Sequence, residues 1–178
     1  AMDVLSFAQP ALAVVGAGII SGLAVDRGIN FWLAFIAALI ATGLLGALLE
    51  RTFLRPMVGE PVFSVAILTI GLDIILRTVL DNWIGVNPRY MGDPIVTWGQ
   101  TGSITFSGLV FKFQELGALM TAILSVIFLG YFFKASKYGL AMKATSFDQE
   151  ASLAQGINVG RVFGLVWFIG GILAAFAG

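Results

Sequence analysis

Long runs without a charged side chain are the feature that most constrains the fold of this chain. The clearest run, residues 28–49, is 22 residues long and contains no Asp, Glu, Lys or Arg. A helix needs about 20 apolar residues to cross the hydrocarbon core of a bilayer. Similar runs, one of them interrupted by charges, occupy residues 5–25, 61–82, 116–133 and 162–178. The sequence therefore predicts an all-α polytopic membrane protein with about five transmembrane helices, some broken or short, in a single transmembrane domain over residues 1–178.

The composition supports a membrane protein and excludes several functional classes. Hydrophobic residues make up 58% and charged residues 11% of the chain, against about 25% charged residues in soluble domains. The ten basic and ten acidic residues cancel, so no net field favours nucleic acid. Because the chain has no cysteine and no histidine, disulfides, thiolate chemistry, histidine catalysis and the usual zinc sites are excluded. We expect no cofactor and no metal site.

Residues 94–111 are also uncharged, but their composition does not favour a membrane helix. The stretch PIVTWGQTGSITFSGLVF is rich in Thr, Ser and Gly, and its β-branched and aromatic residues flank the sequence GQTGS at 99–103. Such a pattern is typical of two short strands joined by a turn. We therefore predict a small β-hairpin within an extracytoplasmic segment, residues 84–115.

Basic residues concentrate in two of the predicted loops. Loop 134–161 has four basic residues against two acidic ones, and loop 50–60 has two arginines. Two predicted spans separate these loops, so the loops share one side of the membrane. The positive-inside rule makes that side cytoplasmic. Residues 26–27 and the segment 84–115 are then expected outside.

The stretch DQEASLAQGINVGR, residues 148–161, is an unusually polar segment between two apolar runs. Ser146 and Gln149 fit a capping box, in which a hydroxyl at the N-cap precedes a Gln three residues later. Gly156 is suited to the left-handed conformation that ends a helix. These signals predict a short helix over residues 147–155.

So short a helix is marginal in isolation, so we expect it to pack against the membrane domain or a partner protein. The predicted contact face has helical spacing and consists of Phe147, Ala151 and Ala154. An ordinary surface helix that links two spans is equally compatible with the sequence.

Four segments resemble the branched-chain amino acid permease family of ABC importers. EASLAQG (150–156) is similar to the cytoplasmic loop of ABC importer permeases, Glu-Ala-Ala, three residues and Gly, with Ser152 where the second Ala is usual. GALLERTFLRPMVGEP (46–61) resembles the family's first cytoplasmic loop. TIGLDIILR (69–77) and VLSFAQPALAVVGA (4–17) resemble two further family segments, with Gln9 where His is usual. The chain thus resembles an internal portion of such a permease.

The resemblance implies one subunit of an ATP-driven importer in the plasma (inner) membrane of a bacterium or archaeon. It implies a homologous second permease subunit, cytoplasmic ABC ATPase subunits that bind the coupling loop 134–161, and an extracytoplasmic substrate-binding protein. The chain contains no G-x-x-x-x-G-K-[ST] motif, so we expect ATP hydrolysis on a separate subunit and no enzymatic activity here. The residues implied at the ATPase contact are Phe147, Glu150, Ala151, Ser152, Gly156 and Asn158.

Polar groups inside the predicted spans are candidates for the substrate path. Asp73, Arg77 and Asp81 have i, i+4, i+8 spacing on one face, and such groups form a salt-bridged stripe or line a polar pathway. The residue before Pro10 is disfavoured in helical geometry, which indicates either a break in the first helix or a helix start with proline in its first turn. The candidate path residues are Ser6, Phe7, Gln9, Thr69, Gly71 and Asp73. Close helix packing is the alternative role for Thr69 and Gly71, and it is the role that we expect for Gly16, Gly18 and Gly22.

The resemblance favours branched-chain amino acids as the transported solute, with a urea or amide importer of the same family as the alternative. An ATP-independent channel or carrier, or a structural membrane subunit, also fits a chain of apolar helices. An intramembrane enzyme that uses Asp73 and Asp81 is disfavoured. These residues are about 12 Å apart along a helix, and Arg77 between them favours the ionised form of both.

Overall fold

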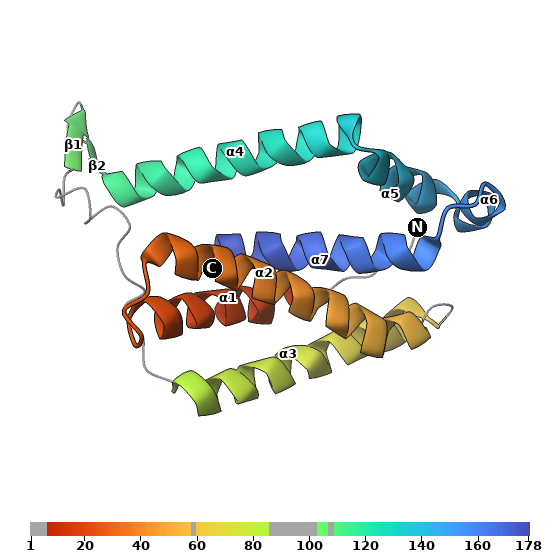
Figure 1. The fold of residues 1–178 in the computed structure, drawn as a ribbon, viewed down its shortest axis with the longest axis horizontal. Helices are drawn as coiled ribbons and strands as arrows, with labels where there is room; N and C mark the ends of the chain where they lie inside the picture. The colour runs from red at the N-terminus through yellow and green to blue at the C-terminus, as the bar shows by residue number, and fades with distance from the viewer. Residues whose placement is uncertain (1–6, 58–59, 86–102, 107–108) are drawn as a thin grey trace. The chain divides into compact units, whose positions relative to one another are not determined.

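The computed structural model describes residues 7–57, 60–85, 103–106 and 109–178. They divide into unit 1, residues 1–92 and 144–178, and unit 2, residues 93–143. The elements, shown in Figure 1, are α1 (Gln9–Ala24), α2 (Phe31–Leu49), the π-helical turn η1 (Glu50–Leu54), the 3₁₀ turn η2 (Arg55–Met57), α3 (Val62–Ile84), β1 (Ser103–Phe106), β2 (Leu109–Lys112), α4 (Phe113–Ala135), α5 (Lys137–Phe147), α6 (Gln149–Ala154) and α7 (Val159–Ala177).

Four helical segments of the described residues are long and apolar enough to cross a membrane. They are Phe31–Met57, Phe63–Trp83, Gly117–Ala135 and Val159–Ala177. Each coincides with one of the predicted runs, which confirms a helical, polytopic architecture. The helix in the fifth run, α1, has only 16 residues. At 1.5 Å per residue it is about 24 Å long, so by itself it is shorter than the roughly 30 Å hydrocarbon core.

Helical structure continues beyond the end of the apolar run in α2. The chain passes directly from α2 into η1 and η2, so residues 50–57 of the predicted loop 50–60 are helical. The wider turns of a π-helix are uncommon and occur frequently at functional sites. Leu54 and Glu50 in this turn are 3% and 4% exposed, and η1 contacts α7. Packing against α7 thus extends the helix past the first charged residues.

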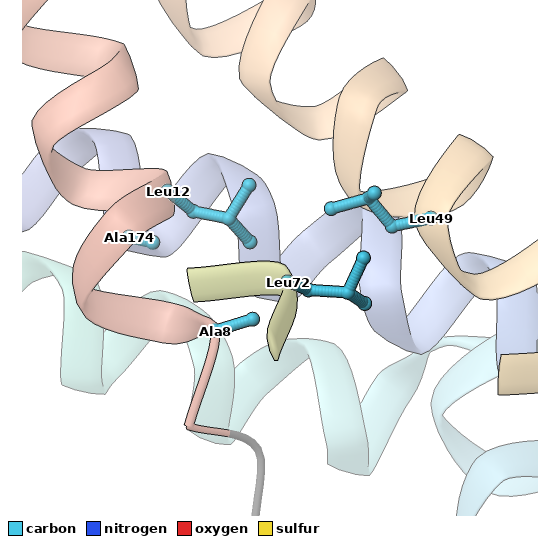
Figure 2. Packing of buried hydrophobic residues seen from close by; sticks show 5 residues of the cluster. All are labelled: Ala8, Leu12, Leu49, Leu72 and Ala174. Atoms are coloured by element: carbon cyan, nitrogen blue, oxygen red, sulfur yellow. The ribbon is translucent and has the colours of Figure 1, made fainter. Parts of the chain in front are cut away.

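The core of unit 1 forms where α1, α2, α3 and α7 meet. Helix α7 packs against α2 and α1, and α3 packs against α1. Figure 2 shows one buried cluster that draws a residue or two from each helix or its start: Ala8, Leu12, Leu49, Leu72 and Ala174. Burial of these side chains ties the four helices together, although α7 lies far from the other three in the sequence.

Glycines let the helices of unit 1 approach closely. A Cβ atom added at Gly46 in α2 would lie 2.5 Å from the backbone oxygen of Trp167 in α7, and one at Gly16 in α1 would lie 2.5 Å from Cβ of Ala175. Helix association in membranes relies on such small residues, so the packing role predicted for Gly16 is confirmed. Gly22 differs, because an added Cβ there would meet no heavy atom within 4 Å.

Helix α2 has two apolar sides with different side-chain sizes. Its packed side carries small residues such as Ala34, Ala38 and Thr42, which are fully buried. Its other side exposes large apolar residues, including Leu33, Ile36, Ile40, Leu44 and Leu48. A helix that is apolar all round is typical of a deeply buried or membrane-spanning position, in accord with the predicted span.

Unit 2 contains a two-stranded antiparallel sheet in which Ser103 pairs with Lys112 and Phe106 with Leu109. The predicted turn sequence GQTGS at 99–103 is therefore misplaced, because Ser103 already begins β1. The connection falls between Phe106 and Leu109, in the sequence Ser-Gly. Residues 86–102, which hold most of the predicted extracytoplasmic segment, lie outside the described residues.

The predicted loop 134–161 contains a helix that the sequence did not predict, α5, before the short helix that it did. Helix α4 continues to Ala135, and α5 occupies Lys137–Phe147. A Cβ added at Gly139 would lie 2.5 Å from the backbone oxygen of Phe132. This close approach shows why a glycine stands just after the bend between α4 and α5.

Candidate functional site

The short helix predicted in the polar loop exists, but it begins later than its sequence signals indicated. Asp148 is the N-cap of α6, and its side chain accepts a hydrogen bond from the backbone N–H of Ala151 at 3.0 Å. Ser146 and Phe147 belong instead to the end of α5. The capping box with Ser146 was therefore wrong, and the helix has six residues, Gln149–Ala154.

Helix α6 packs within the chain through Ser152, and the contact of its predicted face with a partner protein stays a prediction. Ser152 is 4% exposed, and its hydroxyl donates a hydrogen bond to the backbone oxygen of Asp148 at 2.7 Å. Phe147 lies outside the helix and is 80% exposed, while Ala151 and Ala154 are exposed. The predicted face of Phe147, Ala151 and Ala154 is thus not the face that packs within the chain.

The end of α6 follows the geometry that Gly156 predicts. Gly156 has a φ of +82°, a left-handed conformation that only glycine adopts readily. The N–H of Ile157 bonds the oxygen of Ser152 at 3.0 Å, which satisfies a carbonyl that the helix end would otherwise leave unpaired. Asn158 then caps α7 by accepting from the N–H of Arg161 at 3.0 Å. The caps Asp148 and Asn158 and the left-handed Gly156 therefore fix how α6 leads into α7.

A buried carboxylate lies beside the first turns of α7. Glu50 in η1 is 4% exposed, and an added Cβ at Gly164 would lie 3.5 Å from its Oε2 atom. The guanidinium groups of Arg55 and Arg51 are the positive charges that interact with it. The side chain of Arg55 also lies against Gly160. Two glycines in the first turns of α7, Gly160 and Gly164, thus face a pair of charged residues from η2 and η1.

Sequence reasoning did not single out Glu50. It stands at the end of an apolar run, directly before Arg51, within the LERTFLRP sequence that carried part of the family resemblance. An acidic residue at the end of a predicted span is costly to bury unless cations lie near it. The cost of burying an acidic residue there, together with the two nearby arginines, was the signal that could have identified Glu50 from the sequence.

The structure brings together two of the residues predicted for a substrate path. The backbone N–H of Phe7, just before α1, donates to Oγ1 of Thr69 in α3 at 3.3 Å. Thr69 is fully buried, and its hydroxyl donates to the oxygen of Ala66 at 2.9 Å. Gln9 lies against α7 instead, because its Nε2 atom would be 3.1 Å from a Cβ added at Gly170 of that helix. Ser6 lies outside the described residues.

The start of α1 is compatible with the prediction that Pro10 stands in the first turn of a helix, the alternative to a break in that helix. Ala8 is the N-cap with no side-chain hydrogen bond, and Pro10 stands in the first turn of a helix that begins at Gln9. A proline is tolerated there because the first N–H groups have no helical partner. The hydrogen bond from Phe7 to Thr69 anchors the chain before this start.

The charged residues of α3 form one ion pair rather than a ladder. Arg77 Nε lies 2.9 Å from Oδ2 of Asp73, whereas Asp81 is exposed and makes no ion pair with the described residues. Oδ1 of Asp73 is buried and has no hydrogen-bond partner among the described residues. Gly71 makes no close packing contact, because an added Cβ would meet no atom within 4 Å.

Several apolar helices of membrane-spanning length are the architecture of a multi-pass membrane protein. The chain belongs to the family described as branched-chain amino acid transport system / permease component, whose model matches residues 1–178. This family is one of transport permeases, as the four segments quoted above predict.

Individual relatives are distant. The chain is 27% identical over 146 residues to the high-affinity branched-chain amino acid transport system permease protein BraD of Pseudomonas aeruginosa, which covers 81% of this chain and 47% of BraD. It is 30% identical over 147 residues to the corresponding protein LivH of Salmonella typhimurium, with the same two shares, 81% and 47%. It is also 28% identical over 177 residues to the fructose import permease protein FruF of Bifidobacterium longum, covering 94% of this chain and 44% of FruF.

The chain thus spans about half the length of the curated relatives it matches. No solved structure matches it.

Proposed function

We propose that this chain forms part of the permease subunit of an ATP-driven ABC importer, and that the imported solute is a branched-chain amino acid. Membership of the permease family supports this proposal. The observation that carries it is α6, a short helix that is capped at its start by Asp148 and ended by a left-handed Gly156. ATP hydrolysis then takes place on separate cytoplasmic ABC ATPase subunits, and this chain is not itself an enzyme.

In this proposal α6 is the coupling helix that an ATPase subunit contacts. A helix this short keeps its shape only if its ends are fixed, and the caps of α6 supply that. Its outward side offers Glu150 and Ala151, both exposed, and the exposed ring of Phe147 stands beside it. Ser152 faces inward and positions the helix rather than touching the partner.

Movement of α6 passes to the membrane helices through α7. Only residues 155–158 separate the two helices, and Gly156 and Asn158 fix this connection by hydrogen bonds. Helix α7 packs along α2 and α1, and its first turns lie against Glu50 and Arg55. A displacement of α6 by the ATPase therefore tilts α7 and shifts α2 through η1.

The orientation in the membrane that we propose follows from the distribution of basic residues among the loops. Residues 134–161 and 50–60 face the cytoplasm, and residues 84–115, including the β1–β2 pair, lie on the outer side, where a substrate-binding protein delivers the solute. With α1 as a short fifth span, the chain supplies one side of a pathway in the plasma (inner) membrane of a bacterium or archaeon. A homologous second permease subunit supplies the other side.

The substrate path that we propose runs along α1 and α3. Phe7 and Thr69 lie together near the start of α1, and Gln9 lies beside α7. Asp73 stands one turn after Thr69 on α3, with one carboxylate oxygen unpaired among the described residues. Ionisable groups within a span usually line a cavity or pathway.

The fructose permease relative favours a second candidate solute, a sugar. Two observations argue for the amino acid instead. A neutral sugar has no ammonium group to offer the buried Oδ1 atom of Asp73, whereas an amino acid has one. Two of the relatives above are named as permeases for branched-chain amino acids. Urea and short amides are likewise uncharged.

Uptake by the full-length permease, reconstituted in proteoliposomes with its ATPase subunits and its substrate-binding protein, tests the proposal. We expect ATP-dependent accumulation of labelled leucine that unlabelled isoleucine and valine reduce and that fructose, urea and acetamide do not. Vesicles without the ATPase subunits are the control. Import of fructose or urea without import of leucine would contradict the proposed solute. Leucine flux that needs neither ATP nor the ATPase would indicate a channel or carrier.

A further inference from the structure

A cavity of about 370 Å³ opens between the end of α1 and the end of α3 in unit 1. This volume lies within the range of about 300–1,000 Å³ that small-molecule sites occupy. Its lining includes Asp26 and Arg27, which directly follow α1, and Trp83 near the end of α3. None of these residues belongs to the coupling segment or to the path residues discussed above.

The cavity lies at the end of unit 1 away from α6. Helix α6 contacts α7, and α7 contacts η1 at the far end of α2. Asp26 and Arg27 stand in the connection that precedes the start of α2, at the opposite end of that helix. Figure 1 shows this connection between α1 and α2 on the side of unit 1 where α3 ends. In the proposed orientation the cavity therefore opens to the outer side.

The lining combines both signs of charge with an apolar wall. Asp26 supplies a carboxylate and Arg27 a guanidinium, while Ile19, Leu23 and Trp83 supply apolar surface. A carboxylate is a suitable partner for an ammonium group, and a guanidinium binds a carboxylate with two parallel hydrogen bonds. An uncharged sugar needs neither group, and an ion of one sign needs only one of them.

We infer that this cavity is an outward-facing entry site for a zwitterionic amino acid with an apolar side chain. Asp26 holds the α-ammonium group and Arg27 holds the α-carboxylate. The side chain of the amino acid lies against Ile19, Leu23 and Trp83. The inference rests on the proposed function and goes further, because it gives the amino acid a first binding site before the path along α1 and α3.

One glycine in the lining makes the inference directly testable. An added Cβ at Gly22 would meet no heavy atom within 4 Å, and Gly22 lines the cavity. The first carbon of a side chain placed here therefore collides with no packed atom, and a leucine takes up space in the lining of the cavity. Gly130 in α4 is a matched control, because it also lies within a helix with no heavy atom within 4 Å of an added Cβ and is not part of the lining.

The experiment measures binding of labelled leucine, up to millimolar concentration, to the full-length permease with its ATPase subunits in nanodiscs, without nucleotide or substrate-binding protein. We expect Gly22→Leu, Asp26→Asn and Arg27→Gln each to weaken binding by about tenfold or more, the effect of losing one charge-assisted hydrogen bond or the space for the ligand. Gly130→Leu leaves binding within about twofold of the unaltered protein. Elution of each variant as the intact complex shows that it folds.

Two analogues assign the charges separately. 4-Methylpentanoate lacks the ammonium group of leucine, and leucinamide lacks the carboxylate. Both compete weakly with leucine for the unaltered protein. In Asp26→Asn the potency of 4-methylpentanoate relative to leucine rises, and in Arg27→Gln that of leucinamide rises. A variant that only disturbs the fold would weaken all three compounds together.

Several outcomes would overturn the inference. One is that all three cavity variants bind leucine within about twofold of the unaltered protein and rank the two analogues as the unaltered protein does. Another is a loss of receptor-dependent uptake without a loss of receptor-free binding, which would make this surface a contact for the substrate-binding protein. A third is reduced retention of phosphatidylethanolamine with unchanged leucine binding, which would assign the cavity to a lipid headgroup. Failure of the unaltered complex to import leucine would instead contradict the proposed function.

Discussion

The backbone N–H of Phe7 lies 3.3 Å from the hydroxyl oxygen of Thr69, a residue 62 positions further along the chain. This hydrogen bond joins the segment before α1 to the buried side of α3. It occurs where the first apolar helix begins, so it anchors a helix start that has no side-chain cap. The hydroxyl of Thr69 is thus the acceptor that holds the start of α1 on α3.

Replacement of Thr69 by valine should detach this anchor. Valine has nearly the same shape but no acceptor, and the loss of one such hydrogen bond costs about 0.5–1.5 kcal/mol. We expect Thr69→Val to lower the thermal midpoint of the purified permease and to reduce leucine uptake, while Thr69→Ser keeps both. Thr121→Val is the matched control, because the hydroxyl of Thr121 donates to carbonyl oxygens of its own helix. Equal effects of the two valine variants would argue against the anchor.

A methyl group at Gly46 should separate two helices of the core. The added Cβ would lie 2.5 Å from the backbone oxygen of Trp167, so α2 and α7 must move apart. Overpacking of this kind costs about 1–3 kcal/mol. We expect Gly46→Ala to lower the midpoint for heat-induced loss of the monodisperse size-exclusion peak. Gly71→Ala has free space around the added Cβ and should leave that midpoint unchanged or raise it, and a fall as large as that of Gly46→Ala would contradict the packing account.

The buried side of α6 should accept alanine but not a large residue. Ser152→Ala removes the hydrogen bond to the oxygen of Asp148 but keeps a small side chain. The cost of one such bond is about 1 kcal/mol, so leucine uptake should remain close to that of the unaltered transporter. Ser152→Leu needs space that a side chain 4% exposed does not have, and it should abolish uptake. The reverse order of the two variants would show that Ser152 does not face inward.

The charge of Glu50 should matter more than its shape. Glu50→Gln keeps the size of the side chain but leaves Arg55 beside Gly160 without the carboxylate that interacts with it. We expect less leucine imported per ATP hydrolysed, since η1 then holds the start of α7 less firmly. Glu60→Gln, an exposed acidic residue of the same segment, is the control. Equal transport ratios for both variants and the unaltered protein would contradict a role for Glu50 in positioning α7.

The lengths and places of the membrane helices were predictable because the bilayer sets a minimum apolar length. The run 28–49 corresponds to α2, and the run 61–82 to α3. The helical continuation through Glu50 was not predictable, since a charge normally ends an apolar span and only packing against α7 explains its burial. Helix α5 was missed because its polar and basic residues suit a loop as well as a helix.

The candidate site was predictable where the signal is local and not where it depends on tertiary contacts. The stop at Gly156 follows from the conformational freedom of glycine alone. The start of α6 was misplaced because Ser146 and Asp148 are both good N-caps, and continuation of α5 through Phe147 decides between them. No local pattern places Phe7 beside Thr69 or brings Arg27 and Trp83 to the lining of one cavity. Both arrangements arise from the packing of α1 on α3.

The most direct test of the coupling role of α6 is the ratio of leucine imported to ATP hydrolysed, measured in the same proteoliposomes for Glu150→Ala and Gly156→Val. Valine at a φ of +82° is strained, and alanine removes the exposed carboxylate that an ATPase subunit is proposed to contact. Gly130→Val is the control within a helix. We predict a fall in the ratio of about tenfold or more for both variants, with intact complexes and continued ATP hydrolysis. An unchanged ratio in both variants would contradict the claim that α6 transmits the energy of ATP hydrolysis to the membrane helices.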